Sequence, residues 1–198
     1  MRWKVAAIAT TLVSVLMLAA ALVTSAETTQ SKRRVLVQEI DFIMPEVADF
    51  SGLAQSSDAV TSVEILSRRP ERRAGPRGLG ADIVTVYTAR IIEPFKKHGF
   101  AAIPSSTFTF IQRGGEIDTA TEVLVAESGA RLERGAEYVV FLKWNESLNS
   151  LELAYGPGAA FQLSSGRVIP LGASNLQQRA RAMTAQELVA ELRRRQEP

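Results

Sequence analysis

The sequence predicts a mostly β fold, in which a small, closed or partly open antiparallel barrel of six to eight strands spans about Val35 to Leu171. One C-terminal helix is expected outside the barrel or across its end. Two observations support this: stretches rich in Val, Ile, Thr, Tyr and Phe alternate with the two-residue period of strands, and turns containing Gly or Pro separate them. A two-sheet sandwich is the alternative, because both architectures use regularly spaced short strands.

The strongest strand and turn signals lie in residues 132–163, which we interpret as a β-meander. Alternation from Tyr138 to Trp144 predicts a first strand, a polar turn follows it, and Gly156-Pro157-Gly158 separates a second strand from a third. Tyr138, Trp144 and Tyr155 could line a ligand surface. Their core-facing spacing favours packing in the core instead.

The other elements follow from local patterns. Strands are expected at residues 35–43, 59–67, 82–93, 106–111, 122–126 and 168–171. A short helix is predicted around Phe50, Leu53 and Ala54, which recur at helical spacing. Arg68–Gly80 is rich in arginine, proline and glycine and is expected to form a hairpin loop. Thr184-Ala185-Gln186-Glu187 has the spacing of a capping box and predicts a helix that begins at about Ala185.

The composition divides the chain into five regions. Residues 1–26 form an expected signal peptide, because Arg2 and Lys4 precede the apolar run Val5–Val23 and the small residues Thr24-Ser25-Ala26. The others are a leader with the first strand and a connecting segment (27–57), the barrel domain (58–171), a polar tether (172–183) and the C-terminal helix (184–198). The protein is therefore expected in the periplasm or secreted. An uncleaved anchor in the inner membrane is the alternative, because the apolar run approaches the roughly 20 residues that span a bilayer.

The composition also excludes several classes of function. The chain has no cysteine, so it has no thiol nucleophile, no thiolate metal site and no disulfide. Without Arg2 and Lys4, the 23 basic residues fall to 21, which equals the number of acidic residues. A neutral mature chain does not favour nucleic acid as a partner. No cofactor and no metal are expected.

Five arginines in the predicted hairpin loop form the candidate contact with a partner. They are Arg68, Arg69, Arg72, Arg73 and Arg77. Such a loop suits an anionic surface, so the expected partner is an exported protein or a glycan. A membrane is a partner only if the N-terminal segment stays uncleaved. A solvated loop without a partner is the alternative.

The sequence contains no recognisable catalytic constellation. Glu116 and Asp118 are the least unsuitable pair for a general acid and base, although a plain polar turn explains them as well. His98 is the only histidine, and the adjacent lysines disfavour its protonation and repel a metal. Gly75–Gly80 is expected to precede a strand, whereas phosphate loops precede a helix. Asn145-Glu146-Ser147 matches the N-glycosylation pattern.

Two segments of the meander carry a resemblance to a known family. Gly135-Ala136-Glu137-Tyr138-Val139-Val140-Phe141-Leu142 and Gly156-Pro157, followed by Ala160-Phe161, resemble bacterial exported proteins of unknown function that share a Gly-x-x-Tyr-x-x-Phe-Leu strand and a Gly-x-Phe hairpin. Ala160 stands where that family usually has glycine. The layout from about Asp58 to Leu171 is also similar to netrin-like and metalloproteinase-inhibitor-like modules, which implies an OB-like barrel. Those inhibitors act through an N-terminal cysteine that this chain lacks, so the resemblance implies no inhibition, catalytic residue or cofactor.

Export, the missing catalytic constellation and one charged loop together predict a non-enzymatic binding module that acts in the periplasm or at the cell surface. A carboxylate-based hydrolase or transferase is one alternative. A structural component of an envelope assembly is the other.

Overall fold

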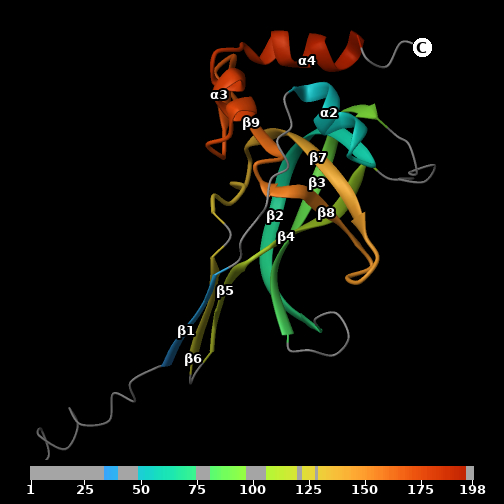
Figure 1. The fold of residues 1–198 in the computed structure, drawn as a ribbon. Helices are drawn as coiled ribbons and strands as arrows, with labels where there is room; N and C mark the ends of the chain where they lie inside the picture. Colours follow the sequence, from blue (N-terminus) through green and yellow to red (C-terminus); the bar gives the residue numbers. More distant parts are fainter. Residues whose placement is uncertain are drawn as a thin grey trace, which may run out of the picture. The chain divides into compact units, whose positions relative to one another are not determined.

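The computed structural model describes residues 34–39, 49–74, 81–96, 106–119, 122–127 and 129–194. Within these ranges the chain forms ten strands and three helices (Figure 1). The strands are β1 (Arg34–Glu39), β2 (Ala59–Ala74), β3 (Ala81–Lys96), β4 (Thr107–Arg113), β5 (Gly115–Asp118), β6 (Glu122–Glu127), β7 (Glu137–Asn145), β8 (Ser150–Pro157), β9 (Ala160–Ser164) and β10 (Arg167–Pro170). The helices are α2 (Phe50–Gln55), α3 (Asn175–Arg181) and α4 (Ala185–Arg194).

Five strands form a closed ring, in which β2 pairs with β3, β3 with β4, β4 with β8, β8 with β7, and β7 with β2. These pairs are antiparallel except for β4 and β8, which run parallel where Ile111 lies opposite Glu152. Strand β7 has three neighbours, because its first half pairs with β9 and its second half with β8. The predicted mostly β fold is confirmed, and the ring is consistent with a small barrel. The parallel β4–β8 pair departs from the antiparallel barrel that the sequence predicts.

Alternate residues of the ring strands fill the interior of the barrel. Its largest side chains include Tyr87, Phe110, Tyr138, Leu142 and Leu153, all of which are buried. The tyrosine hydroxyls also hold the segment before β7, because Leu132 N donates to Tyr87 Oη (3.2 Å) and Glu133 N donates to Tyr138 Oη (2.9 Å). Burial raises the pKa of both tyrosines, so their hydroxyls stay neutral at physiological pH.

Three helices cover the outer face of β2, β7 and β9 (Figure 1). Phe50 of α2 packs against Phe141 and Phe161, with ring centroids 6.4 and 5.2 Å apart. Lys96 Nζ, at the end of β3, donates to three carbonyl oxygens at the C-terminus of α2 at 2.6 to 3.3 Å. These contacts fix α2 to the barrel.

Helix α4 begins where the capping box predicts. Thr184 N donates to Glu187 Oε2 (2.7 Å), and Glu187 N donates to Thr184 Oγ1 (3.2 Å), so each residue satisfies the other's backbone donor. The hydrogen bonds that Thr184 donates to the Glu187 carboxylate, first from its backbone N and then from Oγ1 (2.9 Å), lower the pKa of Glu187. Leu188 and Leu192 on the inner side of the helix are buried against the barrel.

A second sheet, with the strand order β1-β6-β5, contacts the β2–β3 hairpin through β5 and β6. Ile83 of β3 packs against Leu124 and Ala126 of β6. Gly115 at the start of β5 has a φ of +154°, and a Cβ atom there would lie 3.0 Å from Thr85 Oγ1. Glycine is therefore needed at this close approach.

Contrary to the prediction of a hairpin loop over Arg68–Gly80, residues 68–74 continue strand β2 and pair with β3. Residues 75–80 lie outside the described part of the chain. The arginine-rich half of β2 shows no apolar alternation, so its sequence does not predict a strand. Its backbone pairing with β3 stabilises the extended conformation instead. The strand expected at residues 82–93, before Pro94, is also longer than predicted, because β3 passes Pro94 at a register shift and continues to Lys96.

Contrary to the prediction of a polar tether, residues 175–181 form helix α3. Its N-cap Ser174 accepts a hydrogen bond from Gln177 N (3.3 Å). The buried Gln177 side chain donates to the Gly158 carbonyl and accepts from Gly172 N (3.2 Å). The described chain therefore has two C-terminal helices where one is predicted, and more strands than the predicted six to eight.

Candidate functional site

The predicted arginine contact lies on β2, whose alternation divides it between two faces. Cross-strand partners share a face of a sheet. Arg69 lies opposite Val86 of the outer face, whereas Arg68 lies opposite Tyr87, which points into the barrel. The outer face therefore has Arg69 and Arg73, and the opposite face has Arg68 and Arg72. Arg77 lies outside the described residues.

On the outer face, the β2–β3 hairpin is joined to the turn between β7 and β8. Arg69 and Arg73 both form ion pairs with Glu71, which lies between them on the same face. Arg73 Nη1 also donates to the Leu148 carbonyl in the turn (3.3 Å). The Leu148 side chain is buried on three aliphatic residues of β3 and β4. These are Val84, Val86 and Ile111.

Polar contacts hold this turn in place. Asn145 Oδ1 accepts from Leu148 N (3.0 Å), and the Asn145 amide nitrogen donates to Glu152. Glu152 also accepts from Arg113 Nε of β4 (2.9 Å). The amide nitrogen that would carry a glycan is therefore engaged, and the turn itself explains the asparagine in the glycosylation pattern.

The opposite face of the hairpin lines a small pocket of about 250 Å³. Arg68 enters this pocket with Arg131, and its Nη1 donates to the Leu132 carbonyl (3.3 Å). Glu116 and Asp118, the candidate acid and base, are exposed residues two positions apart on β5 and line the same pocket. The structure thus brings together two features that the sequence treats separately, and the carboxylates lie on a strand rather than in a turn.

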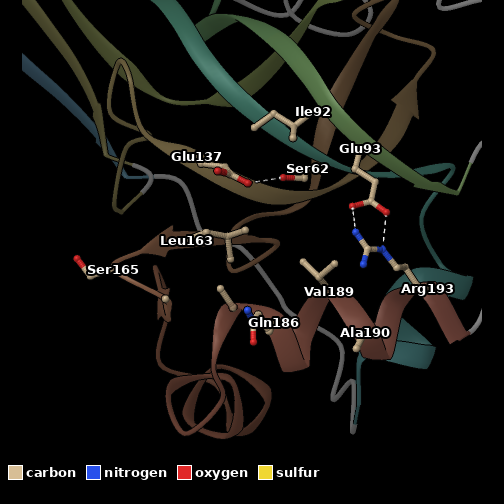
Figure 2. A pocket seen from close by; sticks show the side chains of 12 residues that line it. Ser62, Ile92, Glu93, Glu137, Leu163, Ser165, Gln186, Val189, Ala190 and Arg193 are labelled. Atoms are coloured by element: carbon tan, nitrogen blue, oxygen red, sulfur yellow. Dashed lines mark hydrogen bonds and ion pairs between the residues drawn. The ribbon is translucent and has the colours of Figure 1, made fainter.

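A larger groove, of about 700 Å³, lies between α4 and the sheet (Figure 2). Ser62 of β2, Glu137 of β7 and Leu163 of β9 contribute to it from the sheet. Val189 and Arg193 contribute from α4, as Figure 2 shows. The helices cover the apolar residues on this face of β2, β7 and β9. Ser62, Glu137 and Leu163 lie on the same face but beyond these covered residues, so a groove is left between them and α4.

Two polar pairs stand in the groove (Figure 2). Ser62 Oγ is buried and donates to Glu137 Oε1 (3.0 Å). Arg193 donates from Nε and Nη2 to the two carboxylate oxygens of Glu93, both at 2.6 Å. The Arg193 hydrogen bonds lower the pKa of Glu93, and Glu93 in turn raises the pKa of Arg193. This pair links α4 to β3 across the groove.

Local sequence patterns do not predict this groove. Ser62 and Glu137 are 75 positions apart, and Glu93 and Arg193 are 100 positions apart. Ser62 and Glu137 are each a polar residue on an otherwise apolar strand face, and this is the one local sign that the two strands could contribute to a site. Local spacing cannot show that the two positions meet.

Other predicted residues have structural roles or are not described. His98 and Gly75–Gly80 lie outside the described residues. Tyr138 is buried and Tyr155 half-buried as expected for packing, but Trp144 is 43% exposed, so its predicted core position is wrong. Within the described ranges, no group of three or more His, Asp or Glu side chains is placed to hold a metal ion.

Comparison with known proteins finds no family model that matches this chain, and no curated protein matches it. None of the helices in the described ranges has the length and apolar character needed to cross a bilayer. The predicted signal peptide, residues 1–26, lies outside those ranges.

Proposed function

We propose that this protein is an exported, non-enzymatic binding module whose β2–β3 hairpin contacts an anionic protein or glycan. The observation that carries this proposal is the Arg73 hydrogen bond to the Leu148 carbonyl, which joins the hairpin to the β7–β8 turn. OB-like barrels bind ligands with the loop between their first and second strands and the loop between their fourth and fifth. The hairpin and the turn hold these two positions in the ring. The hairpin and the turn correspond to those loops by analogy of fold.

The charge of the hairpin supports the same proposal. Residues 67–74 contain four arginines and one acidic residue, Glu71. Guanidinium groups bind carboxylate and sulfate in a two-pronged geometry, which suits an acidic protein surface or an acidic glycan. Arg69 is 74% exposed in its side chain and can reach such a partner without a change of the backbone.

The two alternatives have less support. Glu116 and Asp118 line a small pocket but are both exposed, so water reaches the candidate acid and base of a hydrolase or transferase. The other alternative is a structural component of an envelope assembly, and no feature of the described residues points to it specifically. Both remain predictions.

Binding to heparin, a sulfated glycan, tests the proposal. The hairpin variant replaces Arg68, Arg69, Arg72 and Arg73 with Ser. The control variant replaces Arg167, Arg179, Arg181 and Arg194, which are exposed residues of β10, α3 and α4, and removes the same charge. We expect the hairpin variant to lose at least about tenfold in affinity at moderate salt and the control to lose much less.

Equal losses in both variants would show a response to net charge alone and would reject the hairpin as the contact. No retention of the unmodified protein on heparin would reject an acidic glycan as the partner. A hydrolase assay on the same preparations tests the enzymatic alternative, with Glu116→Gln and Asp118→Asn as its variants.

A further inference from the structure

We infer that the groove between α4 and the sheet binds a small organic cation, in which an ammonium or guanidinium group is attached to an apolar body. This inference is independent of the proposed function, because the groove and the arginine hairpin share no residue. The volume of the groove, about 700 Å³, lies within the range of small-molecule sites, roughly 300 to 1,000 Å³.

The charge of the groove favours a cation. Among its lining residues are two carboxylates, Glu93 and Glu137, and one guanidinium, Arg193. Arg193 is bound by both oxygens of Glu93, so that pair is neutral. Within the described part of the chain, Glu137 forms no ion pair, and one negative charge in the groove stays uncompensated.

The Ser62 hydroxyl prepares Glu137 for such a ligand. Ser62 is 2% exposed and donates to Oε1 of Glu137, which fixes the orientation of the carboxylate. Oε2 accepts no hydrogen bond from any described residue. A half-buried, oriented carboxylate with one free oxygen is a strong acceptor for a charged donor.

Apolar side chains beside this carboxylate suit the carbon body of the ligand. Leu163 and Val189 face each other across the groove, as Figure 2 shows, and Ile92 at its margin is 49% exposed. The Glu93–Arg193 pair stands beyond Val189, and the turn at Ser165 lies at the other end. The groove is therefore suited to a short ligand rather than to an extended chain.

Binding of n-hexylammonium to the full chain, followed by NMR chemical-shift titration, tests the inference. Hexan-1-ol and hexanoate are matched probes with the same carbon body. We expect saturable shifts of the Glu137, Leu163 and Val189 amides with hexylammonium, and a dissociation constant on the order of 1 mM. Hexan-1-ol should bind at least about tenfold more weakly, because it lacks the charge, and hexanoate should bind least.

Variants assign the effect to the carboxylate. Glu137→Gln keeps the shape of the side chain and should weaken hexylammonium binding about tenfold. Ser62→Ala leaves the carboxylate in place and should weaken it several-fold. Glu146→Gln in the β7–β8 turn removes the same charge outside the groove and should change nothing. Three results would each overturn the inference. They are equal affinities for hexylammonium and hexan-1-ol, an unchanged affinity of the Glu137→Gln variant for hexylammonium, and the absence of saturable chemical shifts.

Discussion

In the part of the chain that the structure describes, three helices cover the outer face of β2, β7 and β9, whereas the β7–β8 turn alone covers the outer face of β3 and β4. On the first face, apolar side chains from α2, α3 and α4 are buried together with Val139, Phe141 and Phe161 in one continuous cluster. On the second face, Leu148 covers only three aliphatic side chains, and hydrogen bonds of Arg73 and Asn145 hold the turn.

From this difference in packing we expect the helix-covered side of the barrel to be rigid and the side covered by the turn to be more adaptable. Burial of a large apolar cluster is cooperative and costly to undo, so the helix-covered face is expected to stay closed. A turn held by a few polar contacts and one leucine can rearrange at lower cost. A partner at the hairpin would therefore meet a surface that can adjust to it.

The largest expected effect comes from opening the helix-covered face. Phe161→Ala removes a fully buried ring that contacts both Phe50 and Phe141. We expect it to lower the free energy of unfolding by about 3 to 5 kcal/mol, as measured by urea denaturation followed by circular dichroism. A loss below about 1 kcal/mol would contradict the assignment of this cluster as the main core.

A smaller effect is expected from opening the other face. Leu148→Ala should lower the free energy of unfolding by about 2 kcal/mol, because a single side chain leaves a site that the turn can partly refill. Leu148→Met keeps the volume and is the control, with an expected cost below about 1.5 kcal/mol. If Leu148→Ala costs as much as Phe161→Ala, the two faces do not differ as described.

The smallest effect concerns the ion pair that links α4 to β3. Arg193 lowers the pKa of Glu93 below its ordinary value of 4.5 in the folded state. The pair therefore stabilises the fold above pH 4.5, and this contribution is lost as the pH falls through the lowered pKa. Glu93→Gln should flatten the loss of stability at acidic pH, measured by thermal unfolding across a pH series. Glu146→Gln is the matched control, and an equal flattening there would reject the role of the pair.

The sequence predicts those parts of the fold whose signals are local. The capping box at Thr184 and Glu187, the helix around Phe50 and Leu53, and the strand at Tyr138 all have a complete pattern within a few residues. They occur where predicted. Ser174 and Gln177 carry the same type of cap signal for α3, and the polar composition of that helix concealed it.

The candidate sites depend on pairing, which the sequence does not show. The sequence around the arginines of β2 predicts one loop. Only the register with β3 shows that these arginines are divided between two faces of a strand. Arg68 joins Glu116 in a pocket only because β5 lies beside the hairpin. The groove likewise needs α4 folded back onto the sheet, a contact between residues about 100 positions apart.

The ring also has a consequence for the chain during its synthesis and folding. Residues 59–64 of β2 pair with β7, so Ser62 meets its partner strand only after about 75 further residues. Until then, β2 has an open edge of unpaired N–H and C=O groups beside a hydrophobic surface, which is a template for pairing with other chains. We expect a chain that ends before Glu137 to aggregate or to remain bound to a holding chaperone, and the addition of β7 to release it.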